Sequence, residues 1–194
     1  MEKLSKLINS SFSLDEIDFS GFSSSPGWVG YFELVDDFSF SQVDHAFELF
    51  NEFFNSSLNG FFILSALSYC DNKEDDNEVI TRYGKYYEIV KEKKLIKPMT
   101  PEFESYLWGD RDMPANFLTI EFSNELIEPI SKLIMCHAGI VGQSLFLVHP
   151  ELNIVIYPHE DIGFGCISLN GDKSTAVNFL KHCQSSSSFR VTFG

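Results

Sequence analysis

One third of this 194-residue chain carries charge of a single sign. Between Leu7 and Asn72 there is no lysine or arginine, but there are ten carboxylates: Asp15, Glu16, Asp18, Glu33, Asp36, Asp37, Asp44, Glu48, Glu52 and Asp71. A net charge far from zero aids solubility but costs stability through self-repulsion, so the field is either tolerated or kept because a basic molecule docks there. The formal net charge of −14 argues against a nucleic-acid partner, because binding DNA or RNA needs cations to neutralise phosphates.

Length and composition fit one domain spanning residues 1–194. The composition is that of a globular protein, with 44% apolar and 22% charged residues. A chain of this length removes roughly 70% of its unfolded surface from water, enough to fold without disulfides or metal. A proline-rich segment at 98–114 divides the domain into two possible halves, residues 1–97 and 115–194.

No segment of the chain has the pattern of a membrane span. The longest apolar run, from Gly60 to Tyr69, is much shorter than the roughly twenty residues that cross a bilayer. Serines and asparagines near the N-terminus interrupt any secretory signal core. We therefore expect a cytoplasmic protein with no membrane partner.

The clearest helical signal follows Ser39. Ser39 with Gln42, or Ser41 with Asp44, gives a capping pattern. Apolar residues then recur at i, i+4, i+7 and i+11: Val43, Phe47, Phe50 and Phe54. The opposite face carries Asp44, Glu48 and Glu52 at spacings of four, with no cation between them to offset their repulsion.

The remaining pattern predicts the α+β class. Strands are predicted at 28–35, 61–69, 116–122, 144–148, 153–157, 166–169 and 189–193, and helices from Val79, from Ser123 or Asn124 to Ala138, and from Ser174 to Cys183. Residues 79–95 could instead form two short strands, and 98–114 reads as an ordered loop. The order is β-α-β, a variable middle, then β-α-β-β-β-α-β, which predicts a mostly antiparallel sheet with helices packed on it.

The cysteines show no metal-ligand or redox spacing. Cys70, Cys136, Cys166 and Cys183 lack a CxxC pair and are interpreted as reduced thiols. Two of them adjoin a histidine, in Cys136–His137 and His182–Cys183. Neighbours on a helix point about 100° apart, which argues against a nucleophile–base pair, and adjacent ligands poorly reach one zinc ion. We expect no cofactor and no metal.

A loop at His159, Glu160 and Asp161 is the one place where a divalent cation or an acid–base group is conceivable. Gly163 and Gly165 follow it, but the third glycine of a dinucleotide-binding loop is missing, so a tight turn is the expected explanation. A small metal- or cysteine-dependent enzyme using residues 159–161 is therefore an alternative hypothesis.

The acidic residues form the candidate partner-binding site, which comprises Asp36, Asp37, Asp44, Glu48, Glu52, Asp71, Glu74, Asp75 and Asp76. A cationic partner would be steered toward such a surface. Aromatic residues could add the apolar anchors that carboxylates lack, and the candidates are Trp28, Tyr31, Tyr69 and Trp108.

The stretch from Leu152 to Leu169, LNIVIYPHEDIGFGCISL, resembles a strand, Asp-x-Gly turn, strand signature near the C-terminus of several bacterial families. Asp161 and Gly163 match the turn, and Ile162 stands where an arginine is common. Some of these families are immunity proteins of toxin systems. The resemblance implies an immunity protein of the contact-dependent growth inhibition type, which binds a cognate toxin domain, often a basic nuclease, and blocks its active site or substrate groove.

We therefore expect a non-catalytic immunity or inhibitor protein that binds a basic toxin domain, one-to-one, through an acidic surface. The enzyme at residues 159–161 is one alternative. A regulatory module that recognises a basic peptide is another, and it would share the acidic surface.

Overall fold

The computed structural model describes residues 17–18, 22–70, 77–136 and 140–194, excluding the side chains of 140–143. Its centre is one eight-stranded sheet with the order β3-β2-β5-β6-β7-β1-β8, in which β4 also pairs with β2. The strands are β1 (Trp28–Leu34), β2 (Phe62–Tyr69), β3 (Lys97–Pro98), β4 (Thr119–Glu121), β5 (Ile140–His149), β6 (Ile154–His159), β7 (Gly163–Ser168) and β8 (Phe189–Phe193). Among these described strands, β3 alone pairs in parallel, alongside β2. Strands from both predicted halves thus belong to one sheet.

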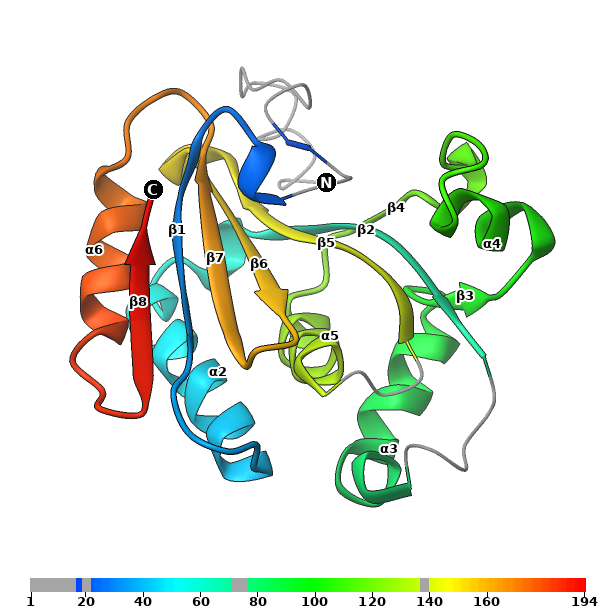
Figure 1. Ribbon diagram of the computed structural model, residues 1–194, viewed down its shortest axis with the longest axis horizontal. Coiled ribbons are helices and arrows are strands. Elements are labelled where there is room, and N and C mark those ends of the chain that lie inside the picture. Colours follow the sequence, from blue (N-terminus) through cyan, green and yellow to red (C-terminus); the bar gives the residue numbers. More distant parts are fainter. Residues whose placement is uncertain (1–16, 19–21, 71–76, 137–139) are drawn as a thin grey trace.

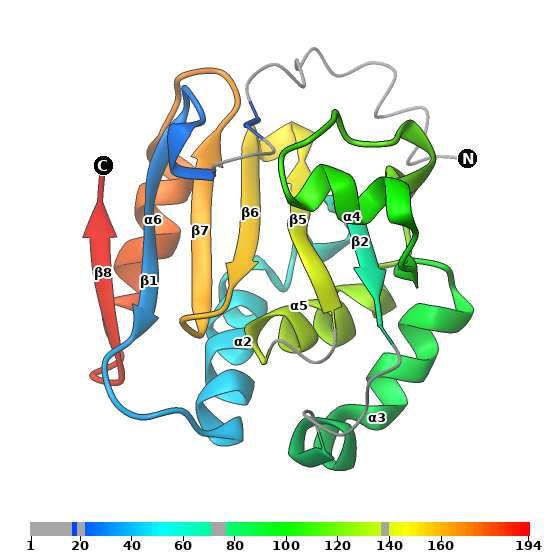
Figure 2. The same cartoon turned by 45° about the vertical axis from the view of Figure 1, so that its right-hand side comes forward.

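Helices cover both faces of this sheet. In the described residues the α-helices are α2 (Phe40–Phe54), α3 (Asn77–Glu92), α4 (Pro101–Leu107), α5 (Ile127–Met135) and α6 (Ser174–Cys183). Short 3₁₀ turns lie at Phe22–Ser24, Leu58–Gly60, Ala115–Phe117, Asn124–Leu126 and Pro150–Leu152. Helices α2, α5 and α6 lie on one face, with α3 beside α5, whereas α4 lies on the other face (Figures 1 and 2).

The larger core lies between the sheet and helices α2, α3, α5 and α6. The predicted apolar stripe of α2 is buried there, with Val43, Phe47, Phe50 and Phe54 almost inaccessible to water. The Phe50 ring packs against those of Phe61, Phe164 and Phe179, which come from three other parts of the chain. Such aromatic contacts favour tilted and edge-to-face packing, which fixes how α2 is seated on the sheet.

A second core lies on the opposite face. Alternate residues of the central strands point there, including Phe62, Leu64, Phe146, Val155 and Tyr157. At the β2 end, Phe103 of α4 and Phe117 stack on each other and cover Ala66. A sheet covered on both faces favours strands that are mostly apolar. Strands β2, β6 and β7 are of that kind, and almost every residue in them is buried.

The structure confirms the predicted class and the order of elements. It shows α3 in place of the two short strands considered for residues 79–95, with a break at Tyr83 (φ −118°, ψ 17°) beside Gly84. The prediction of a loop at 98–114 is wrong, because Pro101 begins α4 and the Thr100 side chain caps it by accepting from Phe103 N at 3.3 Å.

Of the two serines expected to cap helices, Ser39 and Ser174, the structure confirms the first and not the second. Ser39 caps α2 as predicted, accepting from the Gln42 backbone N–H. Ser174 does not cap α6; it is the first helical residue, and its N–H donates to Asp172 Oδ1 at 2.9 Å. Within the described ranges, no helix is both long and apolar enough to cross a bilayer.

Candidate interaction surface and aromatic pocket

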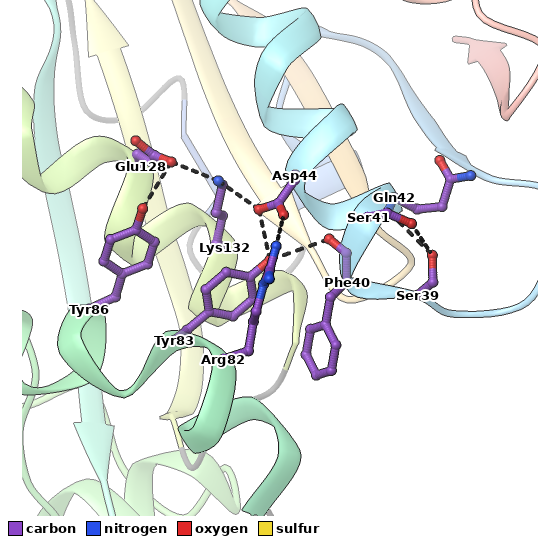
Figure 3. A network of polar contacts seen from close by, with 10 residues as sticks. All are labelled: Ser39, Phe40, Ser41, Gln42, Asp44, Arg82, Tyr83, Tyr86, Glu128 and Lys132. Atoms are coloured by element: carbon purple, nitrogen blue, oxygen red, sulfur yellow. Dashed lines mark hydrogen bonds and ion pairs between the residues drawn. The ribbon is translucent and has the colours of Figure 1, made fainter.

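Asp44 lies in an ion-pair network that joins three helices. Its Oδ1 accepts from Lys132 Nζ of α5 and from Tyr83 Oη of α3, each at 2.8 Å, and its Oδ2 accepts from Arg82 at 2.8 Å (Figure 3). Lys132 Nζ also donates to Glu128 at 2.6 Å. The expectation that no cation offsets the charge of Asp44 is therefore wrong, because cations distant in sequence reach it.

The centre of this network, at Lys132 and Asp44, is largely enclosed. The Lys132 side chain is 8% exposed and that of Asp44 is 25% exposed. Burial by itself raises the pKa of Asp44, but hydrogen bonds from Lys132, Arg82 and Tyr83 outweigh it and lower that pKa. Burial likewise opposes protonation of Lys132, yet its two carboxylate partners raise the pKa of the ammonium group. Asp44 and Lys132 are therefore both charged at neutral pH, and Asp44 links α2, α3 and α5.

Glu48 and Glu52 differ from Asp44. Both side chains are well exposed on α2. Glu48 lies 3.7 Å from His45 Nδ1, and Glu52 lies 3.5 Å from His182 Nε2 of α6. Both acidic side chains are therefore accessible to a partner at the surface of α2.

The segment from Val35 to Phe38, here called the acidic loop, joins β1 to α2. Asp36 and Asp37 are exposed in it. The flanking apolar side chains are also exposed, 55% for Val35 and 52% for Phe38. Two large apolar groups beside two carboxylates give this loop both charge and apolar area. Sequence reasoning singled out the two aspartates but missed Val35 and Phe38.

An open groove of about 510 Å³ lies where α2 and α3 begin. It is lined by Phe40, Asn77, Glu78, Thr81 and Arg82. The Phe40 ring contacts Phe38 of the acidic loop on one side and Tyr83 on the other. The predicted site residues Asp71, Glu74, Asp75 and Asp76 lie outside the described residues, and Asn77 of the groove follows them directly in the chain.

A separate pocket of about 240 Å³ lies on the sheet face opposite α2. This aromatic pocket is lined by Phe22, Ser23, Trp28, Tyr31, Tyr157, His159 and Asp161. Trp28 Nε1–H donates to Tyr157 Oη at 2.9 Å, and His159 Nε2 lies 3.0 Å from the Phe32 carbonyl oxygen. The expected loop at 159–161 is wrong for His159, which is the last residue of β6. The structure places His159 and Asp161 in a cleft, with Trp28 and Tyr31 beside them.

The backbone around this pocket leaves little freedom. Gly163 and Gly165 are in strand β7, contrary to the expected tight turn. A Cβ at Gly163 would collide with the Phe32 carbonyl, and one at Gly165 would collide with the Tyr157 ring. Ile162 has φ +53° with its side chain buried, which is an outlier for a β-branched residue. Tight packing therefore fixes the β6–β7 turn that carries Asp161.

Three of the thiols are poorly suited to nucleophilic chemistry. Burial raises the pKa of Cys136 to about 12 and raises the pKa values of Cys166 and Cys183, so these groups stay protonated at neutral pH. His137, the neighbour of Cys136, lies outside the described residues. Among the side chains that the structure does describe, no three His, Cys, Asp or Glu groups gather as metal ligands.

The other predicted anchors are dispersed. Trp108 is the most exposed large apolar side chain described, but it follows α4, on the sheet face opposite α2 (Figure 2). Tyr69 packs against the larger core and beneath Lys91. Neither lies with the acidic loop. The sequence does not predict that Phe38 is exposed. Phe40 lies only two residues later and is the same residue type, but its ring packs against Tyr83.

The comparisons with known proteins add no relative: no family model, curated protein or solved structure matches this chain.

Proposed function

We propose that this protein is an immunity protein of a toxin system, an inhibitor that binds a basic toxin domain one-to-one through the acidic loop and the exposed face of α2. The observation that carries this proposal is the composition of the acidic loop. Asp36 and Asp37 are exposed between two exposed apolar side chains, Val35 and Phe38. The binding energy of an interface is concentrated in a few anchor side chains that become buried, and exposed acidic residues alone would give only weak binding.

The mechanism follows from this arrangement. Carboxylates at Asp36, Asp37, Glu48 and Glu52 attract a cationic surface and speed its encounter. On a nuclease, the same groups would occupy positions that substrate phosphates take, while Val35 and Phe38 exclude water and slow dissociation. Asp44 is not part of this contact, because Lys132 and Arg82 neutralise it.

The direct test is complex formation with purified basic toxin domains, starting with the product of the adjacent gene. We expect a one-to-one complex by size-exclusion chromatography with light scattering, and stoichiometric loss of nuclease activity. Association should slow as salt rises, because exposed charges are screened over about 10 Å at 0.1 M salt. Binding that is indifferent to salt, or failure to bind any basic domain, would contradict the proposal.

Charge-matched variants locate the surface. Asp36→Asn with Asp37→Asn should lower the association rate constant about tenfold at low salt. The control is Asp110→Asn with Asp112→Asn, which removes the same charge from an exposed segment after α4. Equal effects of the two pairs would mean that net charge, and not this surface, determines association.

An enzyme remains the second candidate because the cleft that it requires around His159 and Asp161 is present. Stoichiometry separates the two functions. A binding protein neutralises one equivalent of toxin, whereas an enzyme acting on the toxin or its product would neutralise many equivalents. A regulatory module for basic peptides would bind such peptides without protecting any target from a toxin.

A further inference from the structure

We propose that the aromatic pocket receives the cationic end of one lysine or arginine side chain of the basic partner. This inference rests on the proposed function and adds a specific subsite to it. The pocket lies on the opposite sheet face from α2, and the acidic residues of the proposed interface do not line it.

The walls of the pocket are aromatic rings set at different angles. The Trp28 and Tyr31 ring centres are 6.3 Å apart at 37°, and Tyr31 meets His159 edge-on at 5.6 Å. Phe22 and Tyr157 are 4.6 Å apart at 50°. A cation binds favourably over the face of an aromatic ring, most strongly over Trp and Tyr, and both kinds of ring line this pocket.

Two groups at the His159 side of the pocket, His159 Nδ1 and the Asp161 carboxylate, are acceptors. The Phe32 carbonyl only accepts, so His159 Nε2 carries the proton and donates to it, which leaves Nδ1 with its lone pair. Burial lowers the pKa of His159, so the ring is neutral at neutral pH. Asp161 Oδ2 lies 4.0 Å from Nδ1, with the Asp161 side chain 68% exposed at the rim. A donor-rich cation matches this set, whereas an anion would meet a carboxylate.

Size and position favour a side chain as the occupant. A volume of about 240 Å³ is smaller than the roughly 300–1,000 Å³ of pockets that enclose whole ligands. The pocket also adjoins the proposed interface, because the Asp161 carbonyl accepts from Leu34 N at 2.9 Å, one residue before the acidic loop. A partner seated on that loop can therefore extend one basic side chain past the end of β1 to Asp161.

The test uses the isolated protein and capped amino acids as probes. In a Trp108→Phe background Trp28 is the sole tryptophan, so its fluorescence reports on the pocket. We expect Nα-acetyl-lysine methylamide or its arginine counterpart to change that fluorescence saturably. The norleucine counterpart, which has no charge, should bind at least about tenfold more weakly, since the aromatic faces favour a cation.

Variants separate the charge of the pocket from its shape. Asp161→Asn and Tyr31→Leu should each weaken binding of the lysine or arginine probe about fivefold or more. Asp110→Asn, which removes the same charge from the exposed segment after α4, should leave it unchanged. Circular dichroism confirms that each variant is folded. Equal binding of norleucine, or no effect of Asp161→Asn, would overturn the inference.

The source of the cation is tested in parallel. Tighter binding of free lysine or cadaverine than of the capped probes would assign the pocket to a soluble amine and overturn a partner side chain. The outcomes for this pocket and for the proposed function are separable. Toxin binding without probe binding removes the pocket inference alone, and probe binding without any basic protein partner removes the immunity function alone.

Discussion

Asp44 and the pair Asp36–Asp37 belong to the same cation-free stretch of sequence, yet the fold gives them opposite environments. Asp44 is mostly enclosed and meets Lys132, Arg82 and Tyr83. Asp36 and Asp37 are exposed on the acidic loop. The difference teaches that a run of like charges in a sequence does not measure charge available to a partner. Cations supplied by α3 and α5 determine which carboxylates remain available.

Removal of Asp44 should have the largest effect on stability. Asp44→Ala leaves the buried Lys132 with Glu128 as its one remaining carboxylate among the described residues, and it takes an acceptor from Tyr83. We expect the free energy of unfolding to fall by about 2–3 kcal/mol, since breaking a buried pair leaves a desolvated charge. Urea denaturation followed by circular dichroism measures it.

The control for Asp44→Ala is Asp36→Asn with Asp37→Asn. Relief of like-charge repulsion should leave stability unchanged or slightly higher in that variant. If both variants lost equal stability, the distinction between enclosed and exposed carboxylates would be false.

Acid should remove the stability that the ionised Asp44 side chain contributes. The pKa of Asp44 in the folded protein is below its ordinary value of 3.8. The contribution of Asp44 to the free energy of unfolding is therefore complete above pH 3.8. It is lost as the pH falls from there through the lower pKa of the folded state. The difference in urea midpoint between the natural protein and Asp44→Asn should shrink between neutral pH and about pH 3. A constant difference would show that Asp44 does not titrate in this network.

Phe38 should matter for binding and not for folding. Phe38→Ser removes an exposed ring from the acidic loop, and we expect toxin affinity to fall at least about tenfold while the urea midpoint stays unchanged. Isothermal titration calorimetry measures the affinity. Leu107→Ser is the matched control, because Leu107 is a partly exposed apolar residue of α4, on the opposite face. An equal loss from Leu107→Ser would place the partner elsewhere.

Glu48 and Glu52 should have the smallest effect. Glu48→Gln with Glu52→Gln should slow association about threefold at low salt and leave dissociation unchanged, because rim charges act mainly on encounter. Stopped-flow fluorescence at two salt concentrations tests this. Persistence of the effect at high salt would indicate direct contact with the partner instead of long-range attraction.

Prediction from sequence worked best where periodicity was strong. Ser174–Cys183 and Phe189–Phe193 match the predicted ranges, because a regular apolar pattern between polar turns leaves few alternatives. It failed at α4, where the three prolines of 98–114 were read as breakers. Pro101 is instead compatible with the first turn of a helix, where its missing N–H has no partner to lose.

The sequence alone determined the α+β class, the buried stripe of α2 and the excess of negative charge, because these depend on local period and composition. Tertiary structure decided which carboxylates are paired and which are exposed, and it formed the aromatic pocket. Asp44 meets Lys132 across 88 positions of chain, and Trp28 meets Tyr157 across 129. Contacts at such separations depend on how strands and helices are arranged, which no local pattern encodes.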